Sequence, residues 1–354
     1  MAITDIDEQK LEQFIGHAAT EVGAALNVAL VTLGHELGLY GAMGDGQPVT
    51  AQELATRTGT QERYVLEWLN VQAASGYVVY ENGTYVLPPE HALVLADETS
   101  PFSMHGTFQS ANAAVAIRER LVDRFTNGDG VGWHEHHHDL WHGTERAFAT
   151  AYRTYLLADW LPALDGVVAK LEAGALVADV GCGHGASTIL PAEAFPASRF
   201  VGVDYHAESI ATARERAAHA GVDDRVRFEV AGAAEYAGHG YDLVAFFDAF
   251  HDLGDPLAAA RRAADALAPG GTVMLVEPFA GDTVEENLNP IGRLYYGFST
   301  LVCTPGSLSQ PGAAGLGTQA GEARIAEVLQ NAGFGSVRRA ADSPLNLVLE
   351  ARLP

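Results

Sequence analysis

A glycine-rich turn between an apolar segment and a helical pattern constrains the fold of this chain more than any other feature. Leu176 and Val177 lead into the run Asp-Val-Gly-Cys-Gly-His-Gly at residues 179–185, and a helical pattern begins near Thr188. A turn this tight requires glycine, because a side chain would block positive φ or close backbone approach. The following helix would direct free N–H groups at a ligand over the turn. The sequence therefore predicts a buried strand, a glycine turn and a helix that together hold a ligand.

Two kinds of ligand fit such a turn. Gly181, Gly183 and Ala186 satisfy the dinucleotide fingerprint, and Asp204 stands where an acidic partner of the ribose is expected. Asp179, however, would place a carboxylate where a pyrophosphate should lie, and a carboxylate repels an anion but attracts an ammonium group. This favours a ligand with an amino group, while a nicotinamide dinucleotide and a turn without any ligand remain the alternatives.

The pattern Asp-x-Gly-x-Gly-x-Gly resembles motif I of the class I S-adenosylmethionine (SAM) methyltransferases. The ligand of that family carries an amino acid tail in place of phosphates, so the resemblance implies SAM as the cofactor. Asp179 would then face the methionine portion and Asp204 the ribose hydroxyls. The residues assigned to the cofactor are Asp179, Gly181, Gly183, Gly185, Asp204, Tyr205, Gly232, Ala233, Phe247 and Asp248.

Composition limits the partners of the chain. Its 354 residues suffice for two domains with separate cores, and its formal net charge is −24. Neither nucleic acid nor an anionic membrane is expected as a partner, because phosphate contacts need clustered Lys and Arg. The chain has two cysteines, and we expect neither a signal peptide nor an apolar run of the roughly 20 residues that a membrane span needs. We expect a cytoplasmic protein that acts on a small molecule.

The first hundred residues have the pattern of a winged-helix domain, which we assign to 1–100. Apolar residues recur at helical spacing from Asp5 to about Met43, and Thr50 and Glu53 form a capping box before a short helix. A second helix over 61–74 precedes two short strands joined by an Asn-Gly turn.

The charge of this domain argues against DNA binding. Residues 1–150 hold seven Lys and Arg against twenty Asp and Glu, so its surface would repel phosphate. We interpret the domain as a dimerisation and substrate-lid domain and expect a homodimer. A SAM-sensing regulator that binds DNA is the alternative from another functional class.

Residues 101–170 are expected to form a helical linker and a lid over the substrate. If the histidine-rich run at 133–142 is helical, His134, His138 and His142 share one face at metal-ligand spacing. The alternatives are a polar, aromatic pocket wall or a solvated face, and we assign no metal ligand. The candidate substrate-binding residues are Trp133, His138, Trp141, Tyr152, Tyr295 and Tyr296.

From residue 171 to 354 strands and helices alternate, which implies a parallel sheet with helices on both faces. We predict an α/β fold with a Rossmann-like sheet of seven strands, the last of them antiparallel, as in the methyltransferase sheet. Ligands bind at the carboxyl ends of such strands, where four acids stand. A predicted short strand begins at residues 176–177, and further predicted strands cover residues 199–204, 226–230, 241–247, 272–277, 336–340 and 345–351, with a turn at 269–271.

The segment after the fourth strand carries the candidate chemistry. Residues 251–253, His-Asp-Leu, resemble the His-Asp-Trp segment of winged-helix small-molecule O-methyltransferases. The resemblance implies that His251 is the general base and that Glu277 orients it. Leu253 replaces the tryptophan of that family, and Gln319 stands nearest to its second orienting acid. In the alternative, N-, S- or C-methylation, His251 would bind the substrate without removing a proton.

Overall fold

The computed structural model describes residues 6–354, so the predicted helix start at Asp5 lies outside the described residues. The chain forms two compact units. One comprises the described residues up to Asn112 together with Asp139–Thr150, and the other comprises Ala113–His138 together with Ala151–Pro354. Residues 101–170, predicted to form a linker and a lid, are divided between the two.

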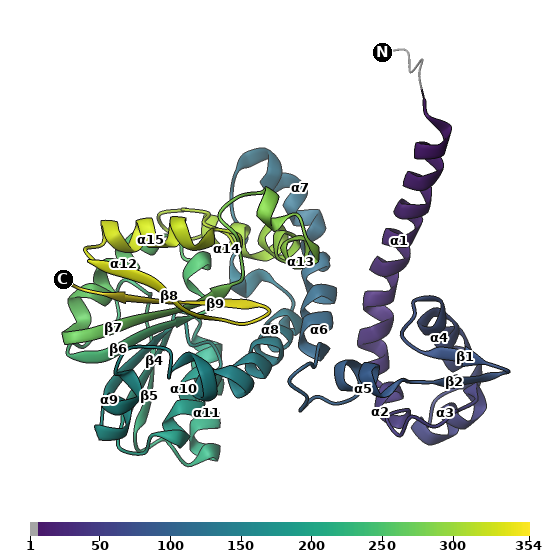
Figure 1. Ribbon diagram of the computed structural model, residues 1–354, viewed down its shortest axis with the longest axis horizontal. Helices are drawn as coiled ribbons and strands as arrows, with labels where there is room; N and C mark the ends of the chain where they lie inside the picture. Colours follow the sequence, from purple (N-terminus) through teal and green to yellow (C-terminus); the bar gives the residue numbers. More distant parts are fainter. Residues whose placement is uncertain (1–5) are drawn as a thin grey trace. The chain divides into compact units, whose positions relative to one another are not determined.

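The first unit is mostly helical and contains a small hairpin (Figure 1). Thr50 Oγ1 accepts a hydrogen bond from Glu53 N at 3.2 Å and Glu53 Oε2 accepts one from Thr50 N at 2.8 Å, which confirms the capping box. The core packs around Tyr40, Leu54 and Trp68. The elements are α1 (Glu8–Glu36), α2 (Leu39–Ala42), α3 (Ala51–Thr58), α4 (Glu62–Ala74), β1 (Val79–Glu81), β2 (Thr84–Val86), α5 (Pro89–Leu95), α6 (His105–Ala114) and α8 (His138–Ala151).

Helix α1 corrects one expectation from the sequence. By length and composition alone it could cross a membrane, with a mean hydropathy of 1.4 over an 18-residue window of which 11% is buried. Small residues such as Ala, Gly and Thr interrupt the larger apolar side chains in the sequence without lowering the mean hydropathy much. The expectation that no such segment exists was therefore wrong.

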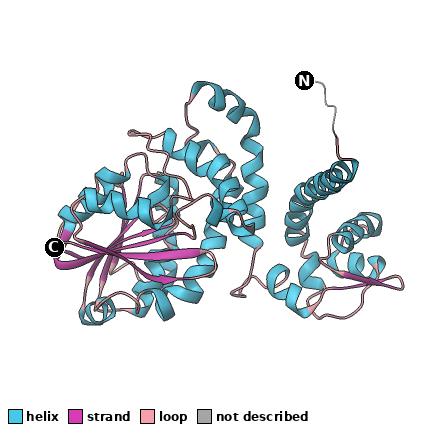
Figure 2. Ribbon diagram, turned by 45° about the horizontal axis from the view of Figure 1, so that its top comes forward, coloured by secondary structure: helices cyan, strands magenta, loops and turns pink. Residues whose placement is uncertain are grey.

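The second unit contains the predicted seven-stranded sheet (Figure 2). Its strand order is β5-β4-β3-β6-β7-β9-β8, parallel from β5 to β7 and antiparallel at β9 and β8. The strands are β3 (Leu176–Val180), β4 (Arg199–Asp204), β5 (Val226–Val230), β6 (Tyr241–Phe247), β7 (Leu267–Pro278), β8 (Ser336–Asp342) and β9 (Asn346–Arg352). The bounds of β4 to β6 agree with the prediction, and β3 continues to Val180 beyond the predicted residues 176–177. The predicted turn at 269–271 is an irregularity within β7.

Helices cover both faces of this sheet, with α12 and α15 on one side and α9, α10 and α11 on the other (Figure 1). Buried Val244, Phe246 and Leu275 fill the space under α12 and α15. The helical elements are η1 (Val115–Ile117), α7 (Arg118–Asn127), η2 (Trp133–Glu135), η3 (Tyr152–Trp160), α9 (Val167–Ala173), α10 (Ala186–Ala194), α11 (Ala207–Ala220), η4 (Phe250–Asp252), α12 (Pro256–Ala266), η5 (Glu285–Asn287), α13 (Pro290–Phe298), η6 (Ser299–Cys303), α14 (Thr304–Leu308) and α15 (Gly321–Asn331).

The strand order reverses between β3 and β6, since β4 and β5 lie on one side of β3 and β6 and β7 on the other. Ligands of open α/β sheets bind beyond the carboxyl ends of the strands at such a switch point. Asp179, Asp204, Asp248 and Glu277 all lie at or next to these ends, as the sequence predicts.

Candidate active site

The glycine turn joins β3 to α10 and has the backbone conformation that the sequence predicts. Gly181, Gly183 and Gly185 have φ values of 81°, 51° and 82°. A Cβ at Gly181 would lie 2.6 Å from Ala249 Cβ, and one at Gly185 would lie 2.7 Å from the Phe228 ring. Glycine is therefore required at these two positions by both conformation and space.

Asp179 lies under this turn and has one oxygen engaged. Its Oδ2 accepts hydrogen bonds from Ser187 Oγ at 2.7 Å and Thr188 Oγ1 at 2.6 Å, in the first turn of α10. Its Oδ1 is buried and has no hydrogen-bond partner among the described residues. Burial raises the pKa of this carboxyl to about 6. The buried oxygen fits the amino group of SAM, since an ammonium would supply both a donor and a compensating charge.

Asp204, at the end of β4, ties the turn to the sheet. Its Oδ2 accepts a hydrogen bond from Gly183 N at 2.9 Å and its Oδ1 accepts one from His206 N at 2.8 Å. Burial raises the pKa of this carboxyl, and the two backbone donors oppose that shift. Each oxygen keeps a second lone pair, so both retain the capacity to accept a ribose hydroxyl.

The other predicted cofactor residues surround the same edge of the sheet. Tyr205 follows Asp204 and is 48% exposed, and Gly232 and Ala233 are half-buried after β5. Phe247 ends β6 and is buried with its ring edge-on to Tyr152, the ring centroids being 5.4 Å apart. Residues at these positions could contact the adenosine portion of a cofactor.

Asp248 differs from these residues because both of its carboxylate oxygens accept hydrogen bonds from side chains of the protein. Oδ1 accepts a hydrogen bond from Asn346 Nδ2 at 2.7 Å and Oδ2 accepts one from Tyr152 Oη at 3.0 Å. Asp248 has a φ of 50°, a left-handed conformation that is strained for a residue with a Cβ. Burial, and then the charge of Glu277, raise the pKa of its carboxyl well above the ordinary value. The network holds the segment between β6 and η4 in place.

His251 and Glu277 lie together in the buried part of the site. Glu277 Oε2 accepts a hydrogen bond from His251 Nδ1 at 2.6 Å, and Oε1 accepts one from Phe250 N at 2.9 Å. The side chains are 4% and 1% exposed. Burial alone would lower the pKa of His251, but the carboxylates of Asp252 and Glu277 raise it well above the ordinary value. This raised pKa favours the ring with both nitrogens protonated. In the neutral form of the ring, a proton on Nδ1 leaves Nε2 as the nitrogen that can accept a proton.

Two further residues at His251 were not identified from the sequence. Asp252 Oδ1 lies 3.2 Å from His251 Nε2, and Cys303 contributes its Sγ from the end of η6. The ligand atoms of the three side chains all lie within 4.8 Å of one another. Asp252 could have been singled out as the acid next to the histidine. Cys303 carries no local signal, because it reaches the site only through the fold.

The two residues that depart from the family pattern, Gln319 and Leu253, do not take over the roles of the family residues at these positions. Gln319 Nε2 donates hydrogen bonds to the carbonyl oxygens of Phe279 at 3.3 Å and Thr318 at 3.2 Å. Leu253 packs against the core. Asp252 is thus the second carboxylate beside the histidine, on the Nε2 side of the ring.

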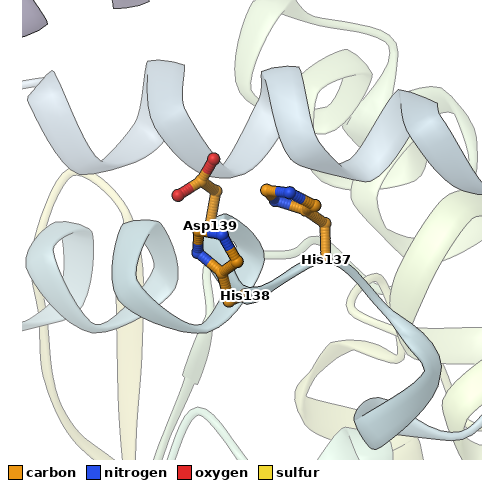
Figure 3. Close-up of side chains that lie close together, drawn as sticks. All are labelled: His137, His138 and Asp139. Carbon is orange, nitrogen blue, oxygen red and sulfur yellow. The ribbon is translucent and has the colours of Figure 1, made fainter.

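The histidine-rich run is not one helix, so the predicted shared face of His134, His138 and His142 is wrong. His134 lies in η2, and His136 is extended with φ −80° and ψ 162°, before α8 begins at His138. Three consecutive residues, His137, His138 and Asp139, instead bring their ligand atoms within 4.8 Å of one another (Figure 3). The boundary between the two units passes through this group.

The predicted substrate residues do not form a single wall. Tyr152 and Tyr295 are buried, and the Tyr295 hydroxyl donates a hydrogen bond to the Leu345 carbonyl at 2.7 Å. Tyr296 is 36% exposed, Trp133 is half-buried and His138 is exposed. Trp141 belongs to the other compact unit. The fold thus holds Tyr295 in place through its hydroxyl, and the substrate roles of all six residues stay predictions.

Comparison with known proteins agrees with this architecture. Residues 178–273 match a family described as a methyltransferase domain, and residues 24–97 match the Rv2258c-like winged HTH domain. A 27-O-demethylrifamycin SV methyltransferase of Amycolatopsis mediterranei is 34% identical over 148 residues, or 40% of this chain and 51% of that protein. The chain thus spans about half the length of this curated relative.

Two solved structures share the fold over nearly the whole chain. A candidate O-methyltransferase of Nostoc punctiforme has a TM-score of 0.72 at 22% identity, covering 95% of this chain and 98% of that one. Human N-acetylserotonin methyltransferase in complex with SAM has a TM-score of 0.70 at 15% identity, covering 100% and 99%. The two matched segments are thus similar to a methyltransferase domain and to a winged HTH domain. The fold over nearly the whole chain is that of the two methyltransferase structures.

Proposed function

We propose that the protein transfers the methyl group of SAM to a hydroxyl of a small molecule, with His251 as the general base. The observation that carries the proposal is the buried pair of His251 and Glu277 at the carboxyl ends of β6 and β7, on the edge that bears the glycine turn. The similar structures include O-methyltransferases, and the one from human is a complex with SAM.

Cofactor binding would fall to the glycine turn and its two carboxylates. Asp179 Oδ1 would accept a hydrogen bond from the amino group of SAM, and Asp204 would accept hydrogen bonds from the ribose hydroxyls. Gly183 would leave room for the cofactor, since no heavy atom lies within 4 Å of a Cβ built there. Bound in this way, SAM supplies an electrophilic methyl carbon.

His251 would act on the substrate hydroxyl. Glu277 holds the proton of Nδ1, so Nε2 would accept the hydroxyl proton while the oxygen bonds to the methyl carbon and the carbon–sulfur bond breaks. The resulting imidazolium would lie between the carboxylates of Glu277 and Asp252, whose charges stabilise it. General-base catalysis of this kind typically contributes about 10²–10⁴-fold in rate.

The first test is calorimetry of the purified protein with SAM, S-adenosylhomocysteine and NADH in parallel, followed by a screen of small hydroxyl compounds with methyl-labelled SAM. We expect both adenosyl ligands to bind, NADH to give no heat, and label to appear on oxygen. Binding of NADH alone would reject the cofactor assignment. Labelled nitrogen, sulfur or carbon, with oxygen unlabelled, would reject the proposed acceptor.

We also propose that the protein forms a homodimer through α1. Phe14, Val22 and Leu26 are 68%, 63% and 66% exposed on this helix, a large apolar surface for a monomer. Residues 8–36 carry four Glu and one Lys, a charge that opposes an anionic membrane surface and leaves a second copy of the chain as the better partner.

Light scattering of Leu26→Glu tests the dimer, with Leu93→Glu on α5, whose leucine is 44% exposed, as the matched control. We expect only Leu26→Glu to reduce the mass to that of a monomer. A monomeric wild-type protein that floats with phospholipid vesicles would contradict the proposal and make α1 a membrane contact.

We propose further that nucleic acid is not a partner and that the protein acts in the cytoplasm. The one cation on α4, the expected recognition helix, is Arg63, and it forms an ion pair with Glu67. An electrophoretic shift of random duplex DNA that weakens with added salt would contradict the first proposal. Fractionation that finds the native protein in the membrane pellet would contradict the second.

A further inference from the structure

The side chains of His251, Asp252 and Cys303 bring three different metal-ligand atoms to one place. His251 and Asp252 come from η4 and Cys303 from η6, so two separate segments build the group. His251 and Cys303 are buried, and the Asp252 side chain is 31% exposed. The group is therefore formed inside the protein with one side toward the outside.

The distance between the histidine and aspartate atoms is close to that expected for two ligands of one metal ion. His251 Nε2 and Asp252 Oδ1 lie 3.2 Å apart, yet Asp252 Oδ1 is buried and has no hydrogen-bond partner among the described residues. The two atoms are thus close enough for an ion pair when the histidine is protonated, without a hydrogen bond between them. In a tetrahedral zinc site with bonds of about 2.0–2.2 Å, neighbouring nitrogen and oxygen ligands are about 3.4 Å apart.

The residue behind the histidine completes this arrangement. Glu277 accepts a hydrogen bond from His251 Nδ1 at 2.6 Å and thereby fixes the ring with Nε2 toward Asp252. A carboxylate that holds the far nitrogen of a ligating histidine is a recurrent partner in zinc sites and strengthens the ligand. Glu277 accepts two backbone donors as well, so its position is set by the fold.

We propose that His251 Nε2, Asp252 Oδ1 and Cys303 Sγ form a binding site for a zinc ion, with a fourth position open on the exposed side of Asp252. Thiolate together with imidazole favours zinc over magnesium and calcium, which prefer oxygen ligands. Three protein ligands with an open position is the composition of sites where zinc also binds water or substrate.

Zinc binding requires every ligand atom to give up its proton. Burial raises the pKa of the Cys303 thiol to about 12, so the thiol keeps its proton in the metal-free protein. On binding, the Sγ–H bond of Cys303 and the Nε2–H bond of a protonated His251 break, Zn–S and Zn–N bonds form, and both protons pass to solvent. The Cys303 thiolate and the Asp252 carboxylate then neutralise the charge of the ion.

Zinc and methyl transfer would exclude each other, because the ion occupies the Nε2 lone pair that serves as the base. Zinc binding does not depend on the proposed function, whereas this inhibition rests on it. The structure thus assigns to the same histidine an active state without metal and a blocked state with zinc.

Cobalt(II) titration of the metal-free protein tests the site, because cobalt replaces zinc and gives a near-ultraviolet charge-transfer band only with a thiolate ligand. The chain has two cysteines, so Cys182→Ala is a matched control for Cys303→Ser. We expect a band that saturates near one equivalent, that zinc abolishes, that survives in Cys182→Ala and that is absent from Cys303→Ser. Cobalt bound only by the histidine-rich run would give no such band.

Asp252→Asn provides a second variant if Cys303→Ser does not fold, and it should weaken cobalt binding at least about tenfold, since loss of an outer-shell partner alone has such an effect. No thiolate band at saturating cobalt, or unchanged affinity in Asp252→Asn, would overturn the site. With the band present, turnover that stays constant at saturating zinc would overturn the inhibition.

Discussion

The cofactor end and the catalytic end of the sheet hold their buried carboxylates in different ways. Asp179 and Asp204 are held by the glycine turn, the first turn of α10 and residue 206, all within one strand–turn–helix–strand stretch. At the catalytic end, Glu277 on β7 holds His251 on η4, which meets Cys303 on η6. Residues close together in the sequence thus build the cofactor end, whereas residues far apart in the sequence build the catalytic end.

The largest effect expected from this comparison is a separation of turnover from cofactor binding. His251→Ala should lower kcat by about 10²–10⁴-fold, since it removes the base. The affinity for SAM should not change, because none of the hydrogen bonds described for the site joins the glycine turn to the His251 side chain. Labelled-methyl kinetics and calorimetry measure the two quantities, with exposed His239→Ala as the control. Near-normal turnover would remove His251 from the mechanism.

Gly181 of the cofactor end lies next to Ala249 of the catalytic end. One methyl group added at Gly181 therefore tests whether the two ends are independent. Gly181→Ala should lower the free energy of unfolding by about 2–4 kcal/mol, combining left-handed strain with overpacking against Ala249. Gly183→Ala is the matched control, because no heavy atom lies within 4 Å and only the strain of about 1–2 kcal/mol applies. Urea unfolding measures both. Equal losses in the two variants would show that contact with Ala249 has no energetic weight.

Asp204→Ala should affect the cofactor end alone. The change leaves the N–H groups of Gly183 and His206 without their acceptor, at about 1–3 kcal/mol for each one that stays buried. We expect the dissociation constant of SAM to rise by about 10–100-fold and kcat at saturating SAM to be retained. Calorimetry and initial rates decide this, with Asp224→Ala, an exposed aspartate, as the control. Unchanged affinity would contradict the ribose assignment.

The smallest effect concerns pH. The pKa of Asp179 is raised to about 6, so below that pH the carboxyl binds a proton and its charge no longer attracts the amino group of SAM. The affinity for SAM should fall about tenfold for each pH unit below about 6. The stability of the cofactor-free protein should change the opposite way, falling as pH rises from about 4 to about 6, because only the folded form then holds the proton.

Calorimetry and thermal unfolding from about pH 4 to about pH 8 would measure these two slopes. Asp179→Asn should bind SAM more weakly and flatten both of them. If the variant kept the wild-type slopes, another group would be responsible for them.

The sequence predicted the cofactor end well because its information is local. The glycine turn fixes the positive φ values, and the apolar runs of β4, β5 and β6 define strands whose bounds agree with the prediction. The capping box before α3 was predicted for the same reason, since Thr50 and Glu53 are three positions apart.

The catalytic end was predicted only in part because tertiary contacts build it. His251 and Glu277 were identified by resemblance, but Cys303, and Asn346 as the partner of Asp248, have no signal in their own segments. The histidine-rich run was misread as helical, since an extended residue at His136 separates η2 from α8. Periodicity alone does not reveal such a break.

The pairing of β9 with β7 has a consequence for the order in which the site is made. β9 follows every other strand of the sheet in the sequence, and its first residue, Asn346, holds Asp248 through a buried hydrogen bond. Leu347 pairs with Glu277, the residue that orients His251. The residues of the glycine turn are therefore synthesised well before β9, the strand that completes the catalytic end. A chain that stops before β9 would contain every residue of the glycine turn and would lack these two contacts of the catalytic end.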